Sequence, residues 1–386
     1  PVPGVLPAAL RAGEAGNAVV VPGDNAGEAA LARCAVYPAA TLLDVIAHLK
    51  GARCIEAAPD ARPEPADSVG PDLDEVRGQS HAKRALEIAA AGGHNLLLIG
   101  PPGTGKSMLA RRLPGILPPM TDREALETAG VNSVLGHRID LSRWRLRPFR
   151  APHHTASAPA VVGGGPGPRP GEISRAHNGV LFLDELPEFG RHVLEVLREP
   201  LEAGVITISR AAQQADFPAR VQLVAAMNPC PCGYLGDTRG SCHCSRDRVA
   251  GYRGKISGPL LDRIDLRVEV GRPPVDTLRD AGAGGECSDA VRKRVVDARS
   301  IALDRSGVCN AELEGERLEA VCETGNEGLA LLDEAIERFA LSVRAYHRVL
   351  RVSRTIADLA GADTVGIAHV AEALSLRALE QRGTID

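Results

Sequence analysis

The chain has few lysines and few aromatic side chains. Five of its 386 residues are lysine, against 40 arginines, and aromatic residues make up 3% with a single tryptophan. Its positive charge is therefore carried mostly by guanidinium groups, which bind phosphate or carboxylate in a bidentate fork. The formal net charge of −4 excludes a basic surface spread over the whole chain. Any contact with nucleic acid must come from a local patch.

Long apolar runs are also missing. No stretch approaches the roughly 18 residues that a membrane-spanning helix needs, so we expect no membrane partner. The first residues, Pro1-Val2-Pro3-Gly4, contain neither an initiator methionine nor a charged region before an apolar core, and we expect the chain to begin inside a longer protein. Nine cysteines without a signal segment fit a reducing cytoplasm better than a disulfide framework, which predicts a cytoplasmic location.

The hydrophobic content of 44% supports real cores, and the length allows two or three domains. Changes in composition divide the chain into a small helix–strand–helix segment, a proline-rich linker, a region that alternates strand-like and helical patterns, a second break and a wholly helical end. The predicted boundaries are 1–56, 57–72, 73–270, 271–287 and 288–386. Within the first segment, we expect helices over 6–12 and 41–49 and a strand over 18–21. The alternating region predicts an α/β fold with buried parallel strands, most clearly at 180–183 and 221–226.

The segment Gly100-Pro101-Pro102-Gly103-Thr104-Gly105-Lys106-Ser107 fits the pattern G-x-x-x-x-G-K-[ST] and follows the apolar run 96–99. A buried strand that ends in such a loop presents backbone N–H groups and a helix N-terminus to a phosphate anion. Lys106 would reach the β- and γ-phosphates, and Ser107 would offer its hydroxyl to Mg²⁺. The alternative, a chance glycine-rich turn, is rare in a chain with so few lysines. We therefore predict that the whole segment binds a nucleoside triphosphate with Mg²⁺.

Asp184 and Glu185 follow the predicted strand 180–183. A carboxylate pair at the carboxyl end of a strand is what a phosphate-loop site needs: Asp184 to hold Mg²⁺ through water, and Glu185 to orient and polarise the attacking water. An ordinary solvated acidic turn is the alternative. Asn228, at the end of the next predicted strand, would lie beside the same water, although asparagine before proline also commonly starts a turn.

These features together resemble an AAA+ ATPase module, with Val76-Arg77-Gly78-Gln79 as its segment before the phosphate loop. Two longer stretches narrow the resemblance: 147–157 (RPFRAPHHTAS) and 170–179 (PGEISRAHNG). They are similar to the magnesium-chelatase-like branch, and within it to the ComM/YifB family, over essentially the whole chain. The resemblance implies a P-loop AAA+ core with a parallel sheet flanked by helices, β-hairpin insertions, an all-α lid at 288–386 and a partial Lon-like α/β segment at 1–56.

The same resemblance implies ATP and Mg²⁺ as cofactors, Val76 and Gly78 beside the nucleotide, and a hexameric ring of this chain with ATP sites between subunits. Arg263 would be the arginine finger that reaches the neighbouring subunit's γ-phosphate, where its charge stabilises the transition state. Arg344, in the first turn of a helix capped by Ser342, matches the family's second sensor. The alternatives are a surface Arg263 paired with Asp262 or Asp265, and a plain solvated Arg344.

The densest basic patch is Arg143-Trp144-Arg145-Leu146-Arg147, followed by Arg150. Its alternation predicts a strand with one basic face, and basic and aromatic residues together suit a DNA backbone with stacked bases. The alternative is a hairpin packed on a neighbour with solvated arginines. The histidine pair that follows, 153–154, was considered as a metal site and set aside, because adjacent side chains point apart in a strand.

A second hairpin is predicted at 204–212. It resembles a hairpin of the same clade whose tip touches DNA in the central channel, and Arg210 would occupy that position. An exposed turn arginine is the alternative.

Four cysteines, Cys230, Cys232, Cys242 and Cys244, form two C-x-C pairs nine residues apart. Their thiolates could satisfy a tetrahedral, structural Zn²⁺, with His243 as an alternate ligand. Free thiols in a loop are the alternative.

The start of the chain, 1–5 with 19–22, resembles the last part of a Lon-type protease domain. A peptidase of that type needs a Ser–Lys dyad with a lysine near position 8, where this chain has Ala8, and its first lysine is Lys50. We therefore predict no proteolytic activity.

The function that these observations favour is an ATP-hydrolysing ring motor that acts on DNA, by branch migration or helicase-type remodelling of recombination intermediates. Two alternatives stay open: a motor subunit for metal insertion, as in magnesium chelatase, and a nucleotide-switched scaffold. Glu185 argues against the scaffold.

Overall fold

The computed structural model describes residues 1–61, 63–64, 70–165, 167–210, 213–237, 240–274, 276–277, 285–339 and 341–377, with the backbone alone of Arg210 and Gln213. No helix within these ranges combines the length and the apolar character that crossing a membrane requires.

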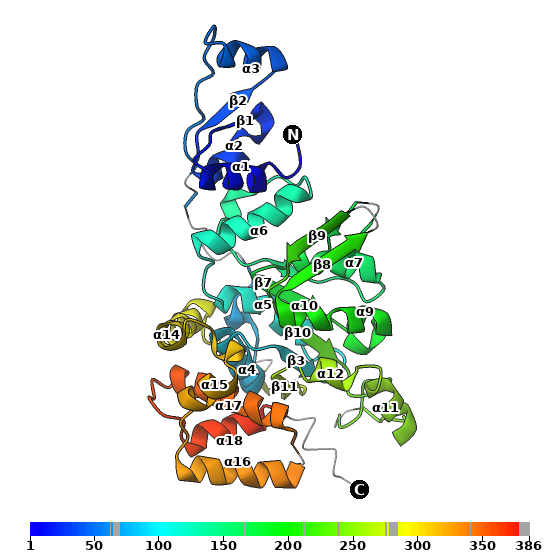
Figure 1. The fold of residues 1–386 in the computed structure, drawn as a ribbon. Helices are drawn as coiled ribbons and strands as arrows, with labels where there is room; N and C mark the ends of the chain where they lie inside the picture. The colour runs from blue at the N-terminus through cyan, green and yellow to red at the C-terminus, as the bar shows by residue number, and fades with distance from the viewer. Residues whose placement is uncertain are drawn as a thin grey trace.

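A five-stranded parallel sheet lies at the centre, in the order β11-β3-β10-β7-β4 (Figure 1). Its strands are β3 (Leu96–Ile99), β4 (Phe149–Arg150), β7 (Gly179–Leu183), β10 (Val221–Met227) and β11 (Leu266–Glu269). The predicted α/β class and the strands at 96–99, 180–183 and 221–226 are confirmed. The carboxyl ends of all five strands meet at one edge, where loops place polar side chains.

The strands read as unbroken apolar runs because both faces of the sheet are covered. In β3, Leu96 and Leu98 face one hydrophobic cluster, and Leu97 and Ile99 face another. Every residue of β3 and β7 is buried. The core therefore consists of two layers, one on each side of the sheet.

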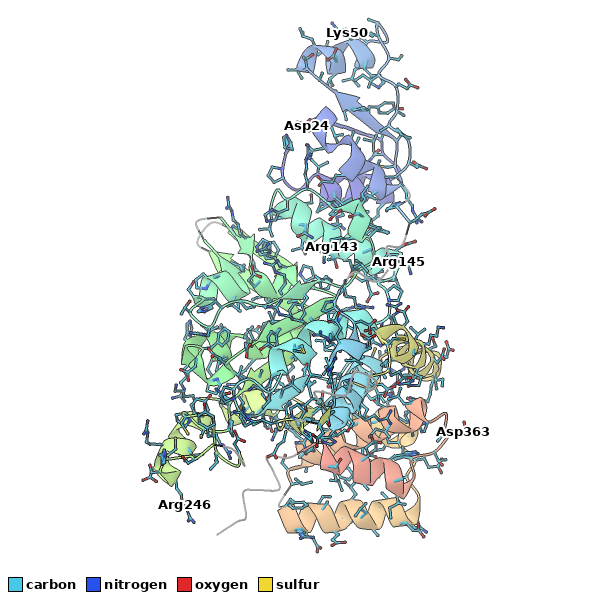
Figure 2. The ribbon with its side chains drawn as sticks, turned by 180° about the vertical axis from the view of Figure 1, so that it is seen from behind. Asp24, Lys50, Arg143, Arg145, Arg246 and Asp363 are labelled. Atoms are coloured by element: carbon cyan, nitrogen blue, oxygen red, sulfur yellow. The ribbon has the colours of Figure 1, made fainter. Side chains whose placement is uncertain are left out.

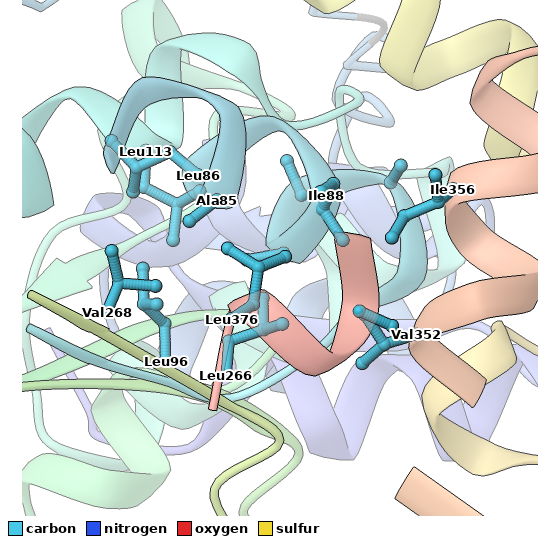
Figure 3. Close-up of a cluster of buried hydrophobic side chains, with 14 of the residues drawn as sticks. Ala85, Leu86, Ile88, Leu96, Leu113, Leu266, Val268, Val352, Ile356 and Leu376 are labelled. Carbon is cyan, nitrogen blue, oxygen red and sulfur yellow. The ribbon is translucent and has the colours of Figure 1, made fainter. Parts of the chain in front are cut away.

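The first layer joins the sheet to helices before and after it in the chain (Figure 3). Leu86 of α4 and Leu113 of α5 pack over Leu96, and Val352 and Leu376 from the C-terminal helical region belong to the same cluster. The helices of this side are α4 (Ser80–Gly92), α5 (Lys106–Ile116), α14 (Ser288–Ser306), α15 (Gly315–Val321), α16 (Asn326–Phe339), α17 (Val343–Leu359) and α18 (Ile367–Ser375). The helical end predicted beyond 288 is thus present, and it shares a core with the sheet.

Shorter elements cover the other face of the sheet. These are α7 (Ala158–Val162), α8 (Glu172–Arg175), α9 (Arg191–Val196), α10 (Arg198–Ala203), α11 (Arg246–Arg253), α12 (Gly258–Leu261), and the antiparallel pairs β5 (Gly163–Gly164) with β6 (Arg169–Pro170) and β8 (Val205–Arg210) with β9 (Gln213–Pro218). The β8–β9 pair confirms that a hairpin begins where it was predicted, at 204–212, but its second strand, 213–218, lies beyond the predicted range. The 3₁₀ turns are η1 (Gly23–Asn25), η2 (Ala30–Ala32), η3 (Leu73–Glu75), η4 (Leu141–Arg143), η5 (Leu186–Glu188) and η6 (Asn310–Glu312).

The N-terminal segment forms a separate lobe at the end of the molecule (Figure 1). Its elements are α1 (Val5–Glu14), β1 (Val19–Pro22), α2 (Ala26–Ala29), β2 (Val36–Ala39) and α3 (Leu42–Leu49). The two predicted helices and the strand are present. Strand β2 was missed because it is short and contains Pro38, and its partner β1 becomes its neighbour only in the fold.

The lobe does not have a core of its own. Leu6 and Ala9 of α1 belong to one hydrophobic cluster with Ala125 and Ala129 of α6 (Asp122–Val134) and with Trp144. The backbone N–H of Gly4 also donates to the carbonyl of Ser133, at 2.9 Å. Helix α6 is therefore the platform on which the N-terminal lobe rests.

Candidate nucleotide-binding site

The phosphate loop connects β3 to the first turn of α5. Its glycines meet two different requirements. Gly103 and Gly105 have φ values of +75° and +92°, in the left-handed region that favours glycine. Gly100 has no room for a side chain, because a Cβ there would lie 2.1 Å from the carbonyl oxygen of Val270. The glycines of the loop thus stand where the backbone needs a positive φ or where a side chain would not fit.

Lys106 lies folded inside its own loop. Its Nζ donates to the carbonyl oxygens of Gly100, at 2.7 Å, and Pro101, at 2.8 Å, and to Oδ1 of Asn228, at 3.2 Å. Burial lowers the pKa of Lys106 to about 8, while the carboxylates of Asp184 and Glu185 act in the opposite direction. The oxygens around this ammonium are uncharged, so a phosphate oxygen would be a stronger partner than any of them.

Two acidic residues face the loop from the end of β7. Asp184 accepts a hydrogen bond of 2.5 Å from the hydroxyl of Ser107, so the hydroxyl and the carboxylate predicted to serve Mg²⁺ are adjacent. Both are hard oxygen donors of the kind that Mg²⁺ prefers, and the pair fits that ion. Glu185 has a left-handed backbone, with φ +53°, and its side chain is half exposed.

A cavity of about 400 Å³ lies over these groups. Its lining combines the phosphate loop, the acidic pair and the end of β10: Pro102, Gly103, Thr104, Gly105, Lys106, Ser107, Met108, Asp184, Glu185, Met227 and Asn228. The structure thus brings together at one sheet edge the residues that the sequence predicts for phosphate, Mg²⁺ and water.

Four of the residues predicted to bind the nucleotide are not among those that line this cavity: Gly100 and Pro101, whose carbonyl oxygens accept hydrogen bonds from Lys106, and Val76 and Gly78. Val76 is buried in the hydrophobic cluster beneath the loop, and Gly78 lies against Pro273 and Thr277. Their neighbour Gln79 was missed: its Nε2 donates to the carbonyl oxygens of Thr104, at 3.1 Å, and Gly271, at 2.7 Å. A polar residue directly before α4 was the available signal. The segment 76–79 therefore contacts and supports the phosphate loop without lining the cavity.

Arg263 and Arg344 both lie outside the cavity. Arg263 pairs with Glu202 and donates to the carbonyl of Pro259 at 2.7 Å, so the pairing with Asp262 or Asp265 considered from the sequence is not what the structure has. Arg344 is exposed, at the start of α17, with its guanidinium 3.9 Å from Asp262. Neither arginine is among the residues that line this chain's own phosphate site.

The basic segment 143–150 does not form the predicted strand. It contains the turn η4, a left-handed Arg145 with φ +65°, and only the short β4 at its end. Trp144 is buried, with 7% of its surface exposed, so it is not available to stack on bases. The alternation of charged and apolar residues gave a wrong prediction of a strand, because the tryptophan side chain packs in the core under the N-terminal lobe.

Most guanidinium groups of this segment are bound within the chain. Arg145 donates to the carbonyl of Met120, Arg147 to those of Pro118 and Asn178. Arg147 also pairs with Glu124, and Arg150 with Glu172 through two hydrogen bonds of 2.6 and 2.9 Å. Arg143 is exposed (Figure 2). Arg145, Arg147 and Arg150 therefore do not form a free basic face, and Arg143 is the exposed member of the set; contact of this segment with DNA stays a prediction.

The β8–β9 hairpin projects beside α7 (Figure 1). Its register pairs Arg210 with Gln213 next to the tip. The side chain of Arg210 and the tip at 211–212 lie outside the described residues, so the proposed contact of Arg210 stays a prediction.

The four cysteines after β10 converge. The Sγ atoms of Cys230, Cys232 and Cys242 are 3.3, 3.6 and 3.7 Å apart, and those of all four cysteines, with Cys244, lie within 4.8 Å of one another. A tetrahedral zinc with Zn–S bonds of about 2.3 Å places its sulfurs about 3.8 Å apart, so the donor set fits that ion. The backbone N–H of Tyr234 lowers the pKa of the Cys232 thiol to about 6, which favours its thiolate. The backbone N–H of Cys244 lowers the pKa of Cys242, but burial and the neighbouring Cys232 and Cys230 sulfurs outweigh it and raise this pKa to about 12.

Comparison with known proteins agrees with this geometry. Residues 72–278 match the family described as magnesium chelatase, subunit ChlI, and residues 285–377 match the C-terminal region of that subunit. The chain is 50% identical to the competence protein ComM of Haemophilus influenzae and 44% identical to YifB of Escherichia coli, each over 98% of this chain and 75% of the relative. The 38 kDa magnesium-chelatase subunit of Cereibacter sphaeroides is 26% identical over 76% of this chain and 87% of its own length.

Family membership accounts for the phosphate loop, the acidic pair and the helical C-terminal region together, and it implies ATP and Mg²⁺ as the ligands of the cavity. The chain belongs to the magnesium-chelatase family of AAA+ proteins and, within it, groups with ComM and YifB.

Proposed function

We propose that this chain is an ATP-hydrolysing subunit of a ring motor that remodels branched DNA. The observation that carries the proposal is the convergence of Lys106, Ser107, Asp184, Glu185 and Asn228 on one cavity. A phosphate clamp, a Mg²⁺ pair and a general base are the parts that ATP hydrolysis requires. A nucleotide-switched scaffold would need only the first two.

The placement of the arginines supports assembly into a ring. Arg263 and Arg344 are not among the residues that line the cavity of their own chain: Arg263 pairs with Glu202, and Arg344 lies beside Asp262. An arginine that stabilises the γ-phosphate in the transition state must reach it directly. We therefore assign these arginines to the nucleotide of an adjacent copy, with a hexamer as the expected assembly. Replacing Arg263 by alanine should then preserve nucleotide binding and abolish turnover in the assembled protein.

DNA is the proposed substrate because two features favour it. The hairpin β8–β9 carries Arg210 next to its tip, and Arg143 is an exposed arginine near α6. The similarity to a competence protein at 50% identity, against 26% to a magnesium-chelatase subunit, favours DNA over a porphyrin. The contribution of the 143–150 segment is reduced to Arg143, since its other basic groups are bound within the chain.

The test combines hydrolysis, binding and strand exchange. ATPase activity is measured with and without single strands and four-way junctions, together with gel shifts and a branch-migration assay. Stimulation by DNA and movement of the junction are expected. Equal ATPase rates with and without DNA, together with no gel shift, would contradict the proposal and favour the metal-insertion motor. Arg210→Ala should lower the stimulation while leaving the basal rate unchanged, with Arg143→Ala as the matched comparison.

We further propose that the four cysteines hold a structural Zn²⁺. Their loop follows Asn228 directly, and a Cβ on Gly233 would lie only 2.7 Å from Cδ of Pro102 in the phosphate loop. The metal would therefore stabilise the segment that carries Asn228. Elemental analysis of the purified protein should give one zinc per chain, and Cys232→Ser with Cys242→Ser should remove it. A metal-free protein with four titratable thiols at this site would refute the assignment.

A further inference from the structure

Arg263, the proposed arginine finger, is bound within its own chain by a carboxylate of α10. Glu202, in the last turn of that helix, accepts a hydrogen bond from Nη2 of Arg263, and the carbonyl oxygen of Pro259 accepts one from Nη1 at 2.7 Å. A guanidinium binds a phosphate most strongly when two of its N–H groups face the phosphate as a fork. Each terminal nitrogen of Arg263 already has a partner, so a phosphate must compete with Glu202 for this side chain.

The contact between Arg263 and Glu202 is one that can be exchanged. The side chain of Glu202 is 70% exposed and that of Arg263 is 20% exposed, and an exposed ion pair contributes little free energy. The Nε of Arg263 is buried and has no hydrogen-bond partner among the residues that the structure describes, which is unusual for a polar atom in a folded chain. A side chain that is held weakly and is not fully satisfied suits a second position with other partners.

The helix that carries Glu202 leads directly into the β8–β9 hairpin (Figure 1). Gly204 ends α10 with a left-handed backbone, at φ +67°, and its N–H donates to the carbonyl of Pro200 at 2.9 Å. The carbonyl of Gly204 accepts a hydrogen bond of 2.8 Å from the N–H of Ala219, the residue that follows β9. Both strands of the hairpin are therefore fixed to the end of α10, so a force on the hairpin reaches Glu202.

The backbone beside Arg263 is anchored elsewhere, to the helical C-terminal region. Its neighbour Asp262 pairs with Arg348 of α17 at 3.3 Å, and the side chain of Arg348 is buried. Arg263 thus has its backbone next to a contact with α17 and its side chain bound to α10. A movement of α10 relative to α17 would break the contact between Arg263 and Glu202 instead of carrying Arg263 along.

We propose that Glu202 is an autoinhibitory residue. Without DNA, its carboxylate holds Arg263 in its own chain; DNA bound at the β8–β9 hairpin displaces α10 and frees Arg263 for the γ-phosphate of the adjacent copy. The carboxylate and the phosphate are alternative partners of one guanidinium, and the position of the hairpin decides between them. This inference rests on the proposed function and adds to it the contact through which DNA would stimulate hydrolysis.

Glu202→Gln tests the restraint, because it keeps the size of the side chain and removes its charge. We expect the ATPase rate without DNA to rise about 3-fold, in keeping with the small contribution of an exposed ion pair, and the rate with DNA to equal that of the parent. Glu199→Gln is the matched control, since Glu199 is exposed on the same helix, and it should change neither rate. An unchanged or lower rate without DNA in Glu202→Gln, or an equal rise in the control, would overturn the proposal.

The chemical reactivity of Arg263 gives a second readout, which does not depend on hydrolysis. Phenylglyoxal modifies accessible guanidinium groups, and peptide mass spectrometry measures the rate at Arg263. We expect this rate to be about 3-fold higher in Glu202→Gln than in the parent and in Glu199→Gln; equal rates in all three would refute the restraint. An inactive parent would refute the ATPase, and a parent that does not respond to DNA would refute the DNA substrate. In both cases the modification rates still decide whether Glu202 restrains Arg263.

Discussion

The carboxyl edge of the central sheet and the segment 143–150 both gather charged side chains, yet these charges face different surroundings. At the sheet edge, Lys106, Asp184 and Glu185 surround an open cavity. In the segment, Arg147 and Arg150 are bound to Glu124 and Glu172 of the same chain. Charge density in a sequence does not say whether a charge is available to a ligand. What distinguishes the first region is that each polar group follows a buried parallel strand, whose end must lie at an edge.

The largest expected effect is the loss of ATP hydrolysis when a charged residue at the sheet edge is replaced. Glu185→Gln should lower ATP hydrolysis at least about 100-fold because the general base is lost, and it should retain nucleotide binding. Lys106→Ala should lose both, since the phosphate clamp is gone. Steady-state ATPase rates and binding of a fluorescent nucleotide measure the two effects. Arg143→Ala, in the other region, should leave both unchanged; a comparable loss there would break the contrast.

Trp144→Ala tests whether the basic segment serves the core. The side chain is buried between the N-terminal lobe and α6, so its removal should destabilise the protein by about 3 kcal/mol. The exposed neighbour Arg143→Ala should cost less than about 0.5 kcal/mol. Urea unfolding followed by circular dichroism measures both. Unchanged stability of the tryptophan variant, with loss of DNA binding, would restore the stacking role.

Gly233→Ala should weaken ATP binding, although Gly233 itself does not line the nucleotide cavity. Gly233 has φ +86°, and its added Cβ would meet Cδ of Pro102 at 2.7 Å. The phosphate loop must then shift, and we expect ATP affinity to fall about 5-fold, or about 1 kcal/mol. Isothermal titration with ATP checks this. Gly236→Ala is the matched control, because Gly236 also has a positive φ, of +79°; an equal loss there would assign the effect to backbone strain alone.

The smallest expected effect is a pH dependence of the basic segment. Burial acts to raise the pKa of Glu124, but the Arg147 guanidinium and the Thr121 N–H outweigh it and hold this pKa below its usual value of 4.5. The folded pKa is thus the lower one, so the stabilisation is complete above about pH 4.5 and is lost as pH falls through the folded pKa. Urea midpoints from pH 6 to 3 should fall less steeply for Glu124→Gln than for the parent. Identical slopes would exclude the pair as a source of stability.

Sequence patterns predicted the phosphate loop, the acidic pair and Asn228 because these depend on local spacing and on strand ends. They did not predict that Val76 and Trp144 are packed in hydrophobic clusters, because burial depends on residues distant in the chain. Gln79 was not assigned to the site, although it stands in the 76–79 segment, because its contacts with Thr104 and Gly271 join segments distant in the chain. The cysteine spacing suggested a metal, and the fold brings all four sulfurs together.

By itself, the sequence determined the fold class, the edge of the sheet where a nucleotide would bind and the residues expected to contact its phosphates, since strand periodicity and glycine geometry are local properties. Only the tertiary structure decided which arginines remain available, that the N-terminal lobe shares its core with α6, and that Gln79 contacts the phosphate loop. Each of these depends on a contact between distant segments, whose free energy comes from the burial and pairing of groups that local pattern cannot bring together.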